Sequence, residues 1–290
     1  MPFLIPVFAV SSVAGLLPLG DCVPETGNDK RRSQVLKLGI CGIGGRMGHA
    51  VWDCCQGLDG VKVVCGIDRL SDSLPTGFAA ELEADPEALH EIPDIFIDFS
   101  RPECSLKLMD FCVQHKCGLV LGTTGFSTEQ RELIKKASKS IPIVFAANFS
   151  VGVTVLCNLI RKASAVLSDT DLEIIEAHHR YKVDAPSGTA LAMGEAAAEA
   201  RHVNLKDVMV EGRNSQSGAR QYGTIGFSSV RGGDIVGEHT AMFCADGERL
   251  ELKHVATSRQ TFASGALRSA RWLEDKKPGL YNLNDVLGLN

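Results

Sequence analysis

The chain has 290 residues, of which 44% are hydrophobic and 22% are charged. This length suits one large or two modest domains, and the composition is typical of a folded globular protein. The formal net charge of −5 argues against a nucleic-acid-binding protein, because such proteins usually carry a basic excess.

Residues 1–34 differ from the rest of the chain. Pro2–Leu19 is apolar and uncharged, and a polar, basic stretch, Gly27–Arg32, follows it. The segment lacks the basic start and the cleavage site of a signal peptide, and its prolines disfavour a spanning helix. We expect an appendage outside the fold, either a targeting segment or a disordered one. No other segment approaches transmembrane length, so we expect no membrane partner.

The chain has 10 cysteines, but none of them form a CxxC pair. We therefore expect no zinc site and no other metal site. Cys41 and Cys65 lie inside apolar stretches. This placement favours buried free thiols over disulfides, and free thiols are typical of a reducing compartment such as the cytoplasm.

Short apolar runs alternate with helical patterns in the first half of the chain. Pro102 is placed to start a helix, and Ser127 with Gln130 forms a capping-box pattern at another start. The alternation predicts right-handed βαβ units and a parallel sheet. The expected strands are 36–41, 61–67, 94–99, 118–121 and 143–146, and the expected helices are 49–55, 102–115 and one from 127.

The second half has a different pattern, which predicts a mixed or antiparallel sheet in a second domain beginning near Ser150. Turn signals at Gly232-Gly233 and Asp246-Gly247 separate three strand-like runs. The expected strands are 172–177, 221–230, 234–243 and 249–256, and the expected helices are 152–167, 188–200 and 262–273.

A glycine-rich turn lies between the first strand and the first helix. Gly42, Gly45 and Gly48 have G-x-x-G-x-x-G spacing, and Asp68 follows Gly48 by 20 residues, at the end of the second strand. Such glycines let the backbone approach a pyrophosphate at a helix N-terminus, and the acidic residue accepts hydrogen bonds from ribose hydroxyls. The pattern predicts a dinucleotide site; the alternative is a plain turn with a solvated Asp68.

Arg69 bears on the choice of cofactor. A carboxylate alone favours NADH, whereas an adjacent arginine pairs with the 2′-phosphate of NADPH. The Asp68-Arg69 pair therefore predicts use of both cofactors. The alternative is that Arg69 is only a surface salt-bridge partner.

Two further turns each follow a strand of the predicted parallel sheet. They are Gly122-Thr123-Thr124-Gly125 and Ala146-Ala147-Asn148-Phe149. The carboxyl ends of such strands line the ligand crevice, so both turns are candidates for holding the nicotinamide end of the cofactor. On local chemistry alone, they are equally well explained as ordinary turns.

The run His178–Lys182 (HHRYK) follows an apolar strand and is rich in potential cations, which suggests an anionic partner. Ser187 is placed to cap the next helix, whose first amides, at Gly188 and Thr189, are suited to a carboxylate. His178 is suited to donate a proton near neutral pH, and Lys182 to share that role. The alternative is a solvated basic loop before an ordinary cap.

Several motifs in the same order together resemble the dihydrodipicolinate reductase family, now called 4-hydroxy-tetrahydrodipicolinate reductase. The resemblance runs from about Leu36 to the C-terminus, and its most specific part is the HHxxKxDxPSGTA run. The motifs are 42–48 (GIGGRMG), 98–103 (DFSRPE), 122–126 (GTTGF), 146–152 (AANFSVG), 176–190 (EAHHRYKVDAPSGTA) and 231–240 (RGGDIVGEHT).

The resemblance implies an α/β fold with two domains. A Rossmann-like dinucleotide-binding domain, 35–149, would be completed by 259–290, and a smaller α/β domain, 150–258, would bind substrate and use its mixed sheet in oligomerisation. It implies a cytoplasmic homotetramer that reduces 4-hydroxy-tetrahydrodipicolinate to tetrahydrodipicolinate with NADH or NADPH, in diaminopimelate and lysine biosynthesis.

The resemblance also assigns roles to residues. His178 would donate and accept the proton and Lys182 would be a second donor, while His179, Gly188 and Thr189 would bind substrate carboxylates. Asp68 stands at a position where glutamate occurs among relatives, and its shorter side chain bears on cofactor preference. The implied cofactor-binding residues are Gly42, Ile43, Gly44, Gly45, Arg46, Met47, Asp68, Arg69, Gly122, Thr123, Thr124, Ala146, Ala147, Asn148 and Phe149.

Two other functions remain open at this point. One is a different two-domain nicotinamide enzyme with the same first half, such as an amino-acid or semialdehyde dehydrogenase. It is distinguished by the second half, because only the tetrahydrodipicolinate enzymes would need the HHRYK and PSGT runs. The other is a nucleotide-sensing protein, which would bind cofactor without turnover.

Overall fold

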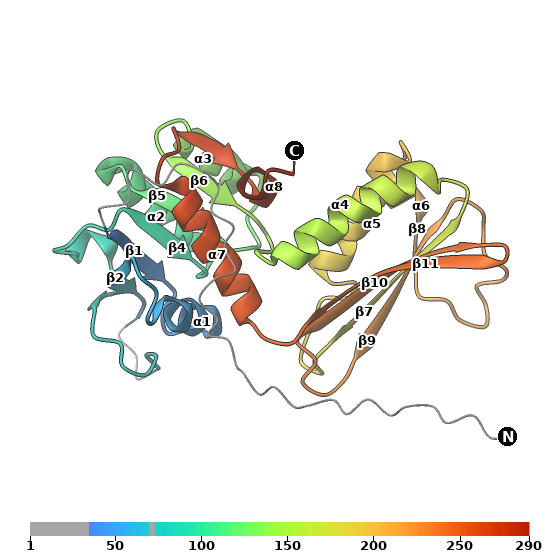
Figure 1. The fold of residues 1–290 in the computed structure, drawn as a ribbon, viewed down its shortest axis with the longest axis horizontal. Coiled ribbons are helices and arrows are strands. Elements are labelled where there is room, and N and C mark those ends of the chain that lie inside the picture. The colour runs from blue at the N-terminus through green and yellow to red at the C-terminus, as the bar shows by residue number, and fades with distance from the viewer. Residues whose placement is uncertain (1–34, 70–72, 290) are drawn as a thin grey trace, which may run out of the picture. The chain divides into compact units, whose positions relative to one another are not determined.

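The computed structural model describes residues 35–69 and 73–289 (Figure 1). The appendage expected at 1–34 lies outside these residues. No helix in the described ranges is long and apolar enough to cross a membrane.

The first sheet has seven strands in the order β12-β6-β5-β4-β1-β2-β3, and all its pairs are parallel. The chain runs outward from β1 in both directions, so the strand order reverses between β1 and β4. Ligands bind outside the carboxyl ends of the strands at such a point. The strands are β1 (Leu36–Cys41), β2 (Val61–Ile67), β3 (Glu81–Glu83), β4 (Ile95–Asp98), β5 (Gly118–Leu121), β6 (Pro142–Phe145) and β12 (Gly279–Tyr281).

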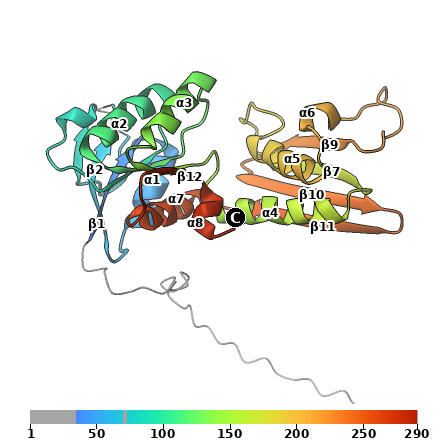
Figure 2. The same ribbon diagram turned by 90° about the horizontal axis from the view of Figure 1, so that it is seen from above.

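Helices cover both faces of this sheet (Figure 2). Ile95 and Ile97 of β4 pack in a core with α1 and α7, whereas Phe96 between them packs in a second core with α2 and α3. Burial on both faces explains why the strands read as continuous apolar runs. The helices are α1 (Arg46–Cys55), α2 (Pro102–His115), α3 (Thr128–Ala137) and α7 (Gln260–Leu273). Two short helices, η1 (Pro86–Ala88) and α8 (Leu283–Leu287), follow β3 and β12.

The second sheet has five strands in the order β11-β10-β7-β9-β8. It is mixed, because β10 is antiparallel to β7 and β11 while β9 is parallel to β7 and β8. The predicted two-part α/β fold is thus confirmed. The elements are α4 (Val151–Val166), β7 (Asp171–His178), α5 (Gly188–Ala200), α6 (Leu205–Val208), β8 (Met209–Glu211), β9 (Ile225–Arg231), β10 (Gly237–Ala245) and β11 (Glu248–Ala256).

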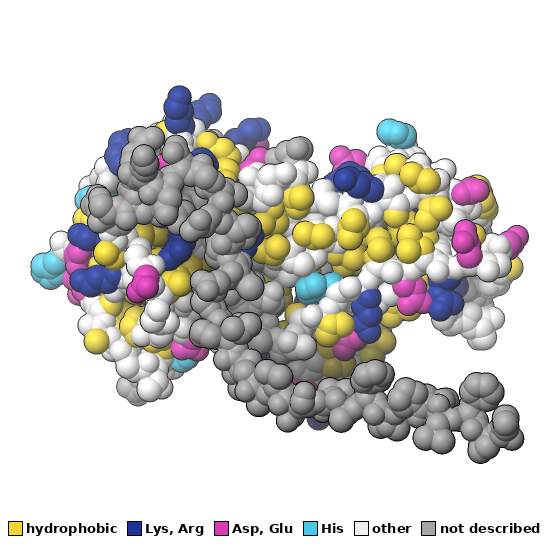
Figure 3. Space-filling model, in the orientation of Figure 1, with side chains coloured by type: hydrophobic (Ala, Val, Ile, Leu, Met, Phe, Trp, Pro, Cys, Tyr) yellow, Lys and Arg dark blue, Asp and Glu magenta, His cyan; other side chains and the backbone are white. Residues whose placement is uncertain are grey.

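The helices α4 and α5 cover one face of the second sheet. Leu172 and Ile174 of β7 point into their core, whereas Ile175 points to the opposite face and is exposed. The outer side of α4 is also apolar and carries Val155, Leu159 and Val166, all of them exposed (Figure 3).

Most predicted elements are confirmed, and the differences have local causes. The predicted 102–115 and 188–200 helices match α2 and α5, and Ser127 forms the expected capping box. By contrast, β9 starts at Ile225 rather than at 221, because Gly223 adopts a positive φ angle of +77° that interrupts an extended chain, and β10 spans Gly237–Ala245 rather than 234–243. Helix α1 begins at Arg46 rather than at His49, because the last glycine of the turn is already helical.

The cysteines of the described residues are free thiols. Five are buried: Cys41, Cys55, Cys65, Cys112 and Cys117. Burial raises the pKa of the Cys55 thiol to about 12, so this group stays protonated and behaves as a small apolar side chain.

Candidate active site

The glycine-rich turn connects β1 to α1 in a conformation that only glycine allows. Gly42 has φ +81°, and its amide donates to the Ile67 carbonyl at 2.8 Å. A Cβ on Gly48 would lie 2.2 Å from the Gly42 carbonyl oxygen, so α1 packs directly on the turn. The N-cap residue, Gly45, provides no side-chain cap. The first amides of α1 are therefore suited to an external anion such as a pyrophosphate.

Asp68 lies against this turn. Its Oδ2 accepts a hydrogen bond from the Gly44 amide at 2.8 Å, and its Oδ1 accepts one from the Arg69 amide at 2.7 Å. The carboxylate is thus fixed at the end of β2 beside the glycine-rich turn, and is not a freely solvated group. The Arg69 residue is exposed.

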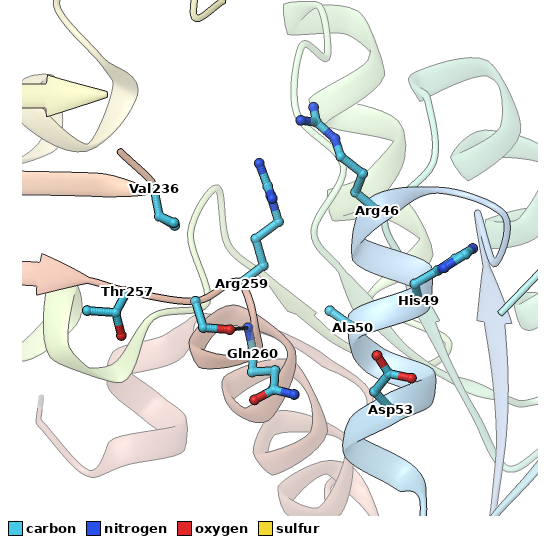
Figure 4. Close-up of a pocket in the computed structure, with 9 residues that line it drawn as sticks. Arg46, His49, Ala50, Asp53, Val236, Thr257, Arg259 and Gln260 are labelled. Carbon is cyan, nitrogen blue, oxygen red and sulfur yellow. Dashed lines mark hydrogen bonds between the residues drawn. The ribbon is translucent and has the colours of Figure 1, made fainter. Parts of the chain in front are cut away.

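A cavity of about 480 Å³ lies beside α1. Arg46 extends into it from α1, and Arg259 from the segment that joins β11 to α7 (Figure 4). Besides these two arginines, the lining of this cavity contains one acidic residue, Asp53. Two guanidinium groups next to the first turn of α1 make this region favourable for phosphate groups. Arg46 was predicted from the sequence, whereas Arg259 was not, because it comes near α1 only through the fold.

A second cavity, of about 570 Å³, collects predicted residues from both halves of the chain. Eight of them line it: Thr124, Ala146, Ala147, Asn148, His178, Lys182, Gly188 and Thr189. Other predicted residues do not belong to this lining. Thr123 and Phe149 are only 3% and 1% exposed, so they lie beneath the surface of the site. Ile43 in the glycine-rich turn is likewise buried, at 0% exposure.

The N-terminus of α5 forms one wall of this second cavity. Ser187 caps the helix as predicted, with its Oγ accepting from the Ala190 amide at 3.2 Å. Thr189 Oγ1 accepts a hydrogen bond from Asn148 Nδ2 at 2.9 Å, which leaves its own proton available to a ligand. No atom lies within 4 Å of a Cβ built on Gly188. The wall thus offers first-turn amides and a hydroxyl in open space, which suits a carboxylate.

His178 is fixed by a buried carboxylate. Its Nδ1 lies 2.6 Å from Oε2 of Glu176, two residues earlier on β7. Glu176 also receives two hydrogen bonds from Arg231, at 2.8 and 2.7 Å, and one from the Ser187 amide at 3.2 Å. The imidazole of His239 on β10 packs edge-on against His178, with ring centroids 5.0 Å apart.

These contacts determine the ionisation of the site. Burial alone would raise the pKa of Glu176, but hydrogen bonds from Arg231, Ser229 and His178 outweigh it and bring the pKa to about 2. Burial lowers the pKa of His178, the adjacent Glu176 carboxylate raises it, and Lys182 and Arg231 lower it, with a net decrease. Burial lowers the pKa of His239 to about 4, so this ring is neutral near pH 7.

Lys182 and His179 differ in their surroundings. Lys182 Nζ pairs with Asp184 Oδ1 at 2.9 Å, and both residues line the second cavity. His179 does not line it, and its Nδ1 is buried without a hydrogen-bond partner in the described part of the chain. The structure therefore brings His178 and Lys182 together in one cavity and leaves His179 outside its lining.

The roles of the residues that support His178 were not predicted from the sequence. Glu176 lies two positions from it in a strand, a spacing that places both side chains on one face. That spacing was a usable signal. Arg231 and His239 lie in the 231–240 motif, but no role was assigned to them, because they reach the site only through strand pairing of His178 with Arg231 and of Glu176 with His239.

Comparison with known proteins follows the same division of the chain. Residues 36–149 match the family described as dihydrodipicolinate reductase, N-terminus, and residues 152–287 match dihydrodipicolinate reductase, C-terminus.

Solved structures show the same likeness. The dipicolinate-bound dihydrodipicolinate reductase from Paenisporosarcina sp. TG-14 is 26% identical, with a TM-score of 0.73 over 87% of this chain and 99% of that one. A probable dehydrogenase from Thermotoga maritima shares the fold at 11% identity, with a TM-score of 0.56 over 88% of this chain and 93% of that one. A myo-inositol dehydrogenase from Corynebacterium glutamicum shares the fold at 13% identity, with a TM-score of 0.52 over 88% of this chain and 93% of that one. The chain belongs to the dihydrodipicolinate reductase family and has its NAD(P)-dependent oxidoreductase fold.

Proposed function

We propose that this protein reduces 4-hydroxy-tetrahydrodipicolinate to tetrahydrodipicolinate with NADH or NADPH, a step of diaminopimelate and lysine biosynthesis. The observation that carries the proposal is the second cavity. Its lining combines His178, which has the buried partner Glu176, with the N-terminus of α5, which suits carboxylates, and with turns at strand ends of the first sheet. The dipicolinate bound to the 26% identical relative is a cyclic dicarboxylate of the same kind.

The glycine-rich turn fits a dinucleotide, because a side chain at Gly48 would collide with the backbone and α1 lacks a side-chain cap. Residues 42–47 would hold the pyrophosphate, with Arg46 and Arg259 neutralising its charge. Asp68 would accept from the adenosine ribose, and Arg69 would pair with the 2′-phosphate of NADPH. When bound, the cofactor supplies the hydride. Residues 122–124 and 146–149 would surround its nicotinamide half, with the buried Thr123 and Phe149 supporting these turns from beneath.

Substrate carboxylates would bind at the N-terminus of α5. The amides of Gly188 and Thr189 and the Thr189 hydroxyl would donate hydrogen bonds, and the helix dipole adds a favourable potential. Lys182 supplies positive charge on the same cavity wall. His179, which the resemblance assigns to a carboxylate, would need to turn toward the cavity to join them.

His178 would deliver the proton that completes the reduction. The 4-hydroxyl group of the substrate first leaves as water, which gives a conjugated imine ring. Negative charge builds on this ring as hydride adds to carbon 4, and a nearby imidazolium or ammonium stabilises it in the transition state. His178 Nε2 is the free ring nitrogen, because Nδ1 is bound to Glu176. Lys182 would be a second donor.

The resemblance also supports a domain assignment and an assembly. Residues 35–149 with 259–290 would form the cofactor domain, and 150–258 the substrate and oligomerisation domain of a cytoplasmic homotetramer. In support, the face of the second sheet opposite α4 and α5 exposes Ile175, Val230 and Val255, and cross-strand pairs connect this face from β9 to β11.

A coupled assay tests the proposal. Dihydrodipicolinate synthase generates the unstable substrate in the cuvette, and nicotinamide absorbance is followed after this protein is added. We expect oxidation of at least one of NADH and NADPH that depends on the synthase. Absence of oxidation with both cofactors would reject the assignment. Amino-acid or semialdehyde substrates serve as controls, and turnover of these alone would favour another dehydrogenase.

A further inference from the structure

Glu176 is a buried carboxylate at the centre of a hydrogen-bond network. Its side chain is 1% exposed, yet it is charged, because its pKa lies at about 2. Arg231 binds both of its oxygens, at 2.7 and 2.8 Å, in a bidentate pair. A buried carboxylate without such a partner would be strongly unfavourable, so Arg231 is what allows the charge to remain here.

An ionised carboxylate only accepts hydrogen bonds, which fixes the proton on the neighbouring imidazole. At 2.6 Å from Glu176 Oε2, Nδ1 of His178 must carry a hydrogen. In neutral His178 the lone pair is then on Nε2, and in the protonated ring Nε2 carries the proton that leaves. A Cβ at Gly237 would lie 3.1 Å from that Nε2, so glycine keeps this side of the ring open.

We infer that Glu176, held by Arg231, is a positioning residue that fixes the proton of His178 on Nδ1, stabilises the protonated ring and so restricts proton exchange with substrate to Nε2. This inference rests on the proposed role of His178 as proton donor.

A purely structural role for Glu176 is the competing explanation. Glu176 also accepts from the Ser187 amide at 3.2 Å, and Arg231 donates to the Asp184 carbonyl at 2.6 Å. These bonds anchor the loop between His178 and α5. Loss of that anchoring would reduce activity but would not change which ring nitrogen of His178 is protonated. The protonation state of His178 therefore separates the two explanations.

The charged and titratable groups facing His178 predict the direction of the change. They are Glu176 on its own strand, Arg231 on β9, His239 on β10 and Lys182 in the following loop. Of these, only Glu176 raises the pKa of His178, while burial, Lys182 and Arg231 lower it. In Glu176→Gln the lowering effects act unopposed, so the pKa of His178 falls further.

The test compares Glu176→Gln with Glu173→Gln. Glu173 lies on the same strand and is also bound by two arginines, Arg213 and Arg220, but it faces away from His178. A general acid is active while protonated, so in Glu176→Gln we expect the alkaline limb of the kcat/KM profile to move to lower pH. We also expect kcat to fall on the order of 10²-fold or more, with cofactor affinity nearly unchanged. Glu173→Gln should keep the wild-type limb.

Imidazole ¹⁵N NMR of the wild type provides a second measurement. It does not require Glu176→Gln to fold, and it does not require turnover. His178 is assigned by loss of its signals in His178→Gln. We expect neutral His178 to carry its proton on Nδ1. A proton on Nε2 would overturn the inference, as would an unshifted alkaline limb in a folded, less active Glu176→Gln. A wild type that shows Nδ1–H but no turnover would instead count against the proposed reaction alone.

Discussion

At the scale of single residues, two adjacent histidines have different environments because β7 ends between them. His178 shares a face of β7 with Glu176 and reaches the second cavity, whereas His179 lies just beyond the strand and outside the cavity lining. The suitability of a histidine as a proton donor thus depends on the carboxylate that binds its other ring nitrogen as much as on its neighbours in sequence.

Replacement of His178 tests its role directly. We expect His178→Gln to lower kcat by roughly 10²- to 10⁴-fold, because the proton donor is lost, with NADH or NADPH affinity nearly unchanged. Steady-state kinetics and cofactor titration measure the two quantities. His90→Gln, at an exposed histidine bound to Glu81, should retain wild-type turnover. Turnover of His178→Gln close to that of wild type would exclude His178 as the main donor.

Gly188 offers a test of the carboxylate site without damage to the fold. A Cβ there meets no atom within 4 Å but lies in the lining of the second cavity. We expect Gly188→Ala to unfold at or above the wild-type temperature and to raise KM about tenfold, which corresponds to about 1.4 kcal/mol of lost binding. Gly232→Ala, also in open space but outside that lining, is the control. An unchanged KM would show that the substrate carboxylate binds at another place.

The sequence could predict residues whose chemistry is local. Ser187 was predicted as a cap and is one, and the proposed proton donors His178 and Lys182 do share a cavity. The roles of Arg231, His239 and Arg259 could not be predicted, although the first two lie in the 231–240 motif, because each residue reaches the site from a distant segment through strand pairing or packing.

At the scale of elements, length and regularity decided what the sequence could predict. The helices α2 and α5 have clear starts and were predicted with correct ends. By contrast, the three-residue strands β3, β8 and β12 were missed. Such short strands have too few residues for a periodic pattern, and pairing with a neighbouring strand defines them.

The pairing of β7 with β10 buries a histidine that should make stability depend on pH. Folding lowers the pKa of His239 to about 4, below the value of about 6.5 expected for the unfolded chain. The unfolded state therefore binds more protons between these values, and the free energy of unfolding should fall as pH drops from 6.5 to 4, by roughly 2–3 kcal/mol from this residue.

Denaturant unfolding at several pH values and a fixed protein concentration measures this dependence. His239→Gln, which retains an acceptor for Ser187, should flatten it, whereas His202→Asn at an exposed position should not. A slope unchanged by His239→Gln would show that other groups cause the acid destabilisation.

At the scale of the whole molecule, the exposed face of the second sheet carries the apolar side chains of Ile175, Val230 and Val255 beside charged ones such as the Glu238–Lys253 ion pair. The proposed tetramer would form on this face. Light scattering should give four copies for the wild type, and Ile175→Asp should lower this number without unfolding the protomer, because it places a charge in the interface. Leu133→Asp is the control, at an exposed leucine on α3. A monomeric wild type would contradict the proposed assembly.

The most direct test of the proposed reductase is the fate of the hydride. The wild type is supplied with nicotinamide cofactor deuterated at the transferred position, in ordinary water, with the synthase generating substrate, and the product is analysed by mass spectrometry. We predict tetrahydrodipicolinate that carries a single deuterium per molecule, in an amount equal to the cofactor oxidised. Cofactor oxidation without deuterium in this product, or no tetrahydrodipicolinate with either cofactor, would contradict the proposed function.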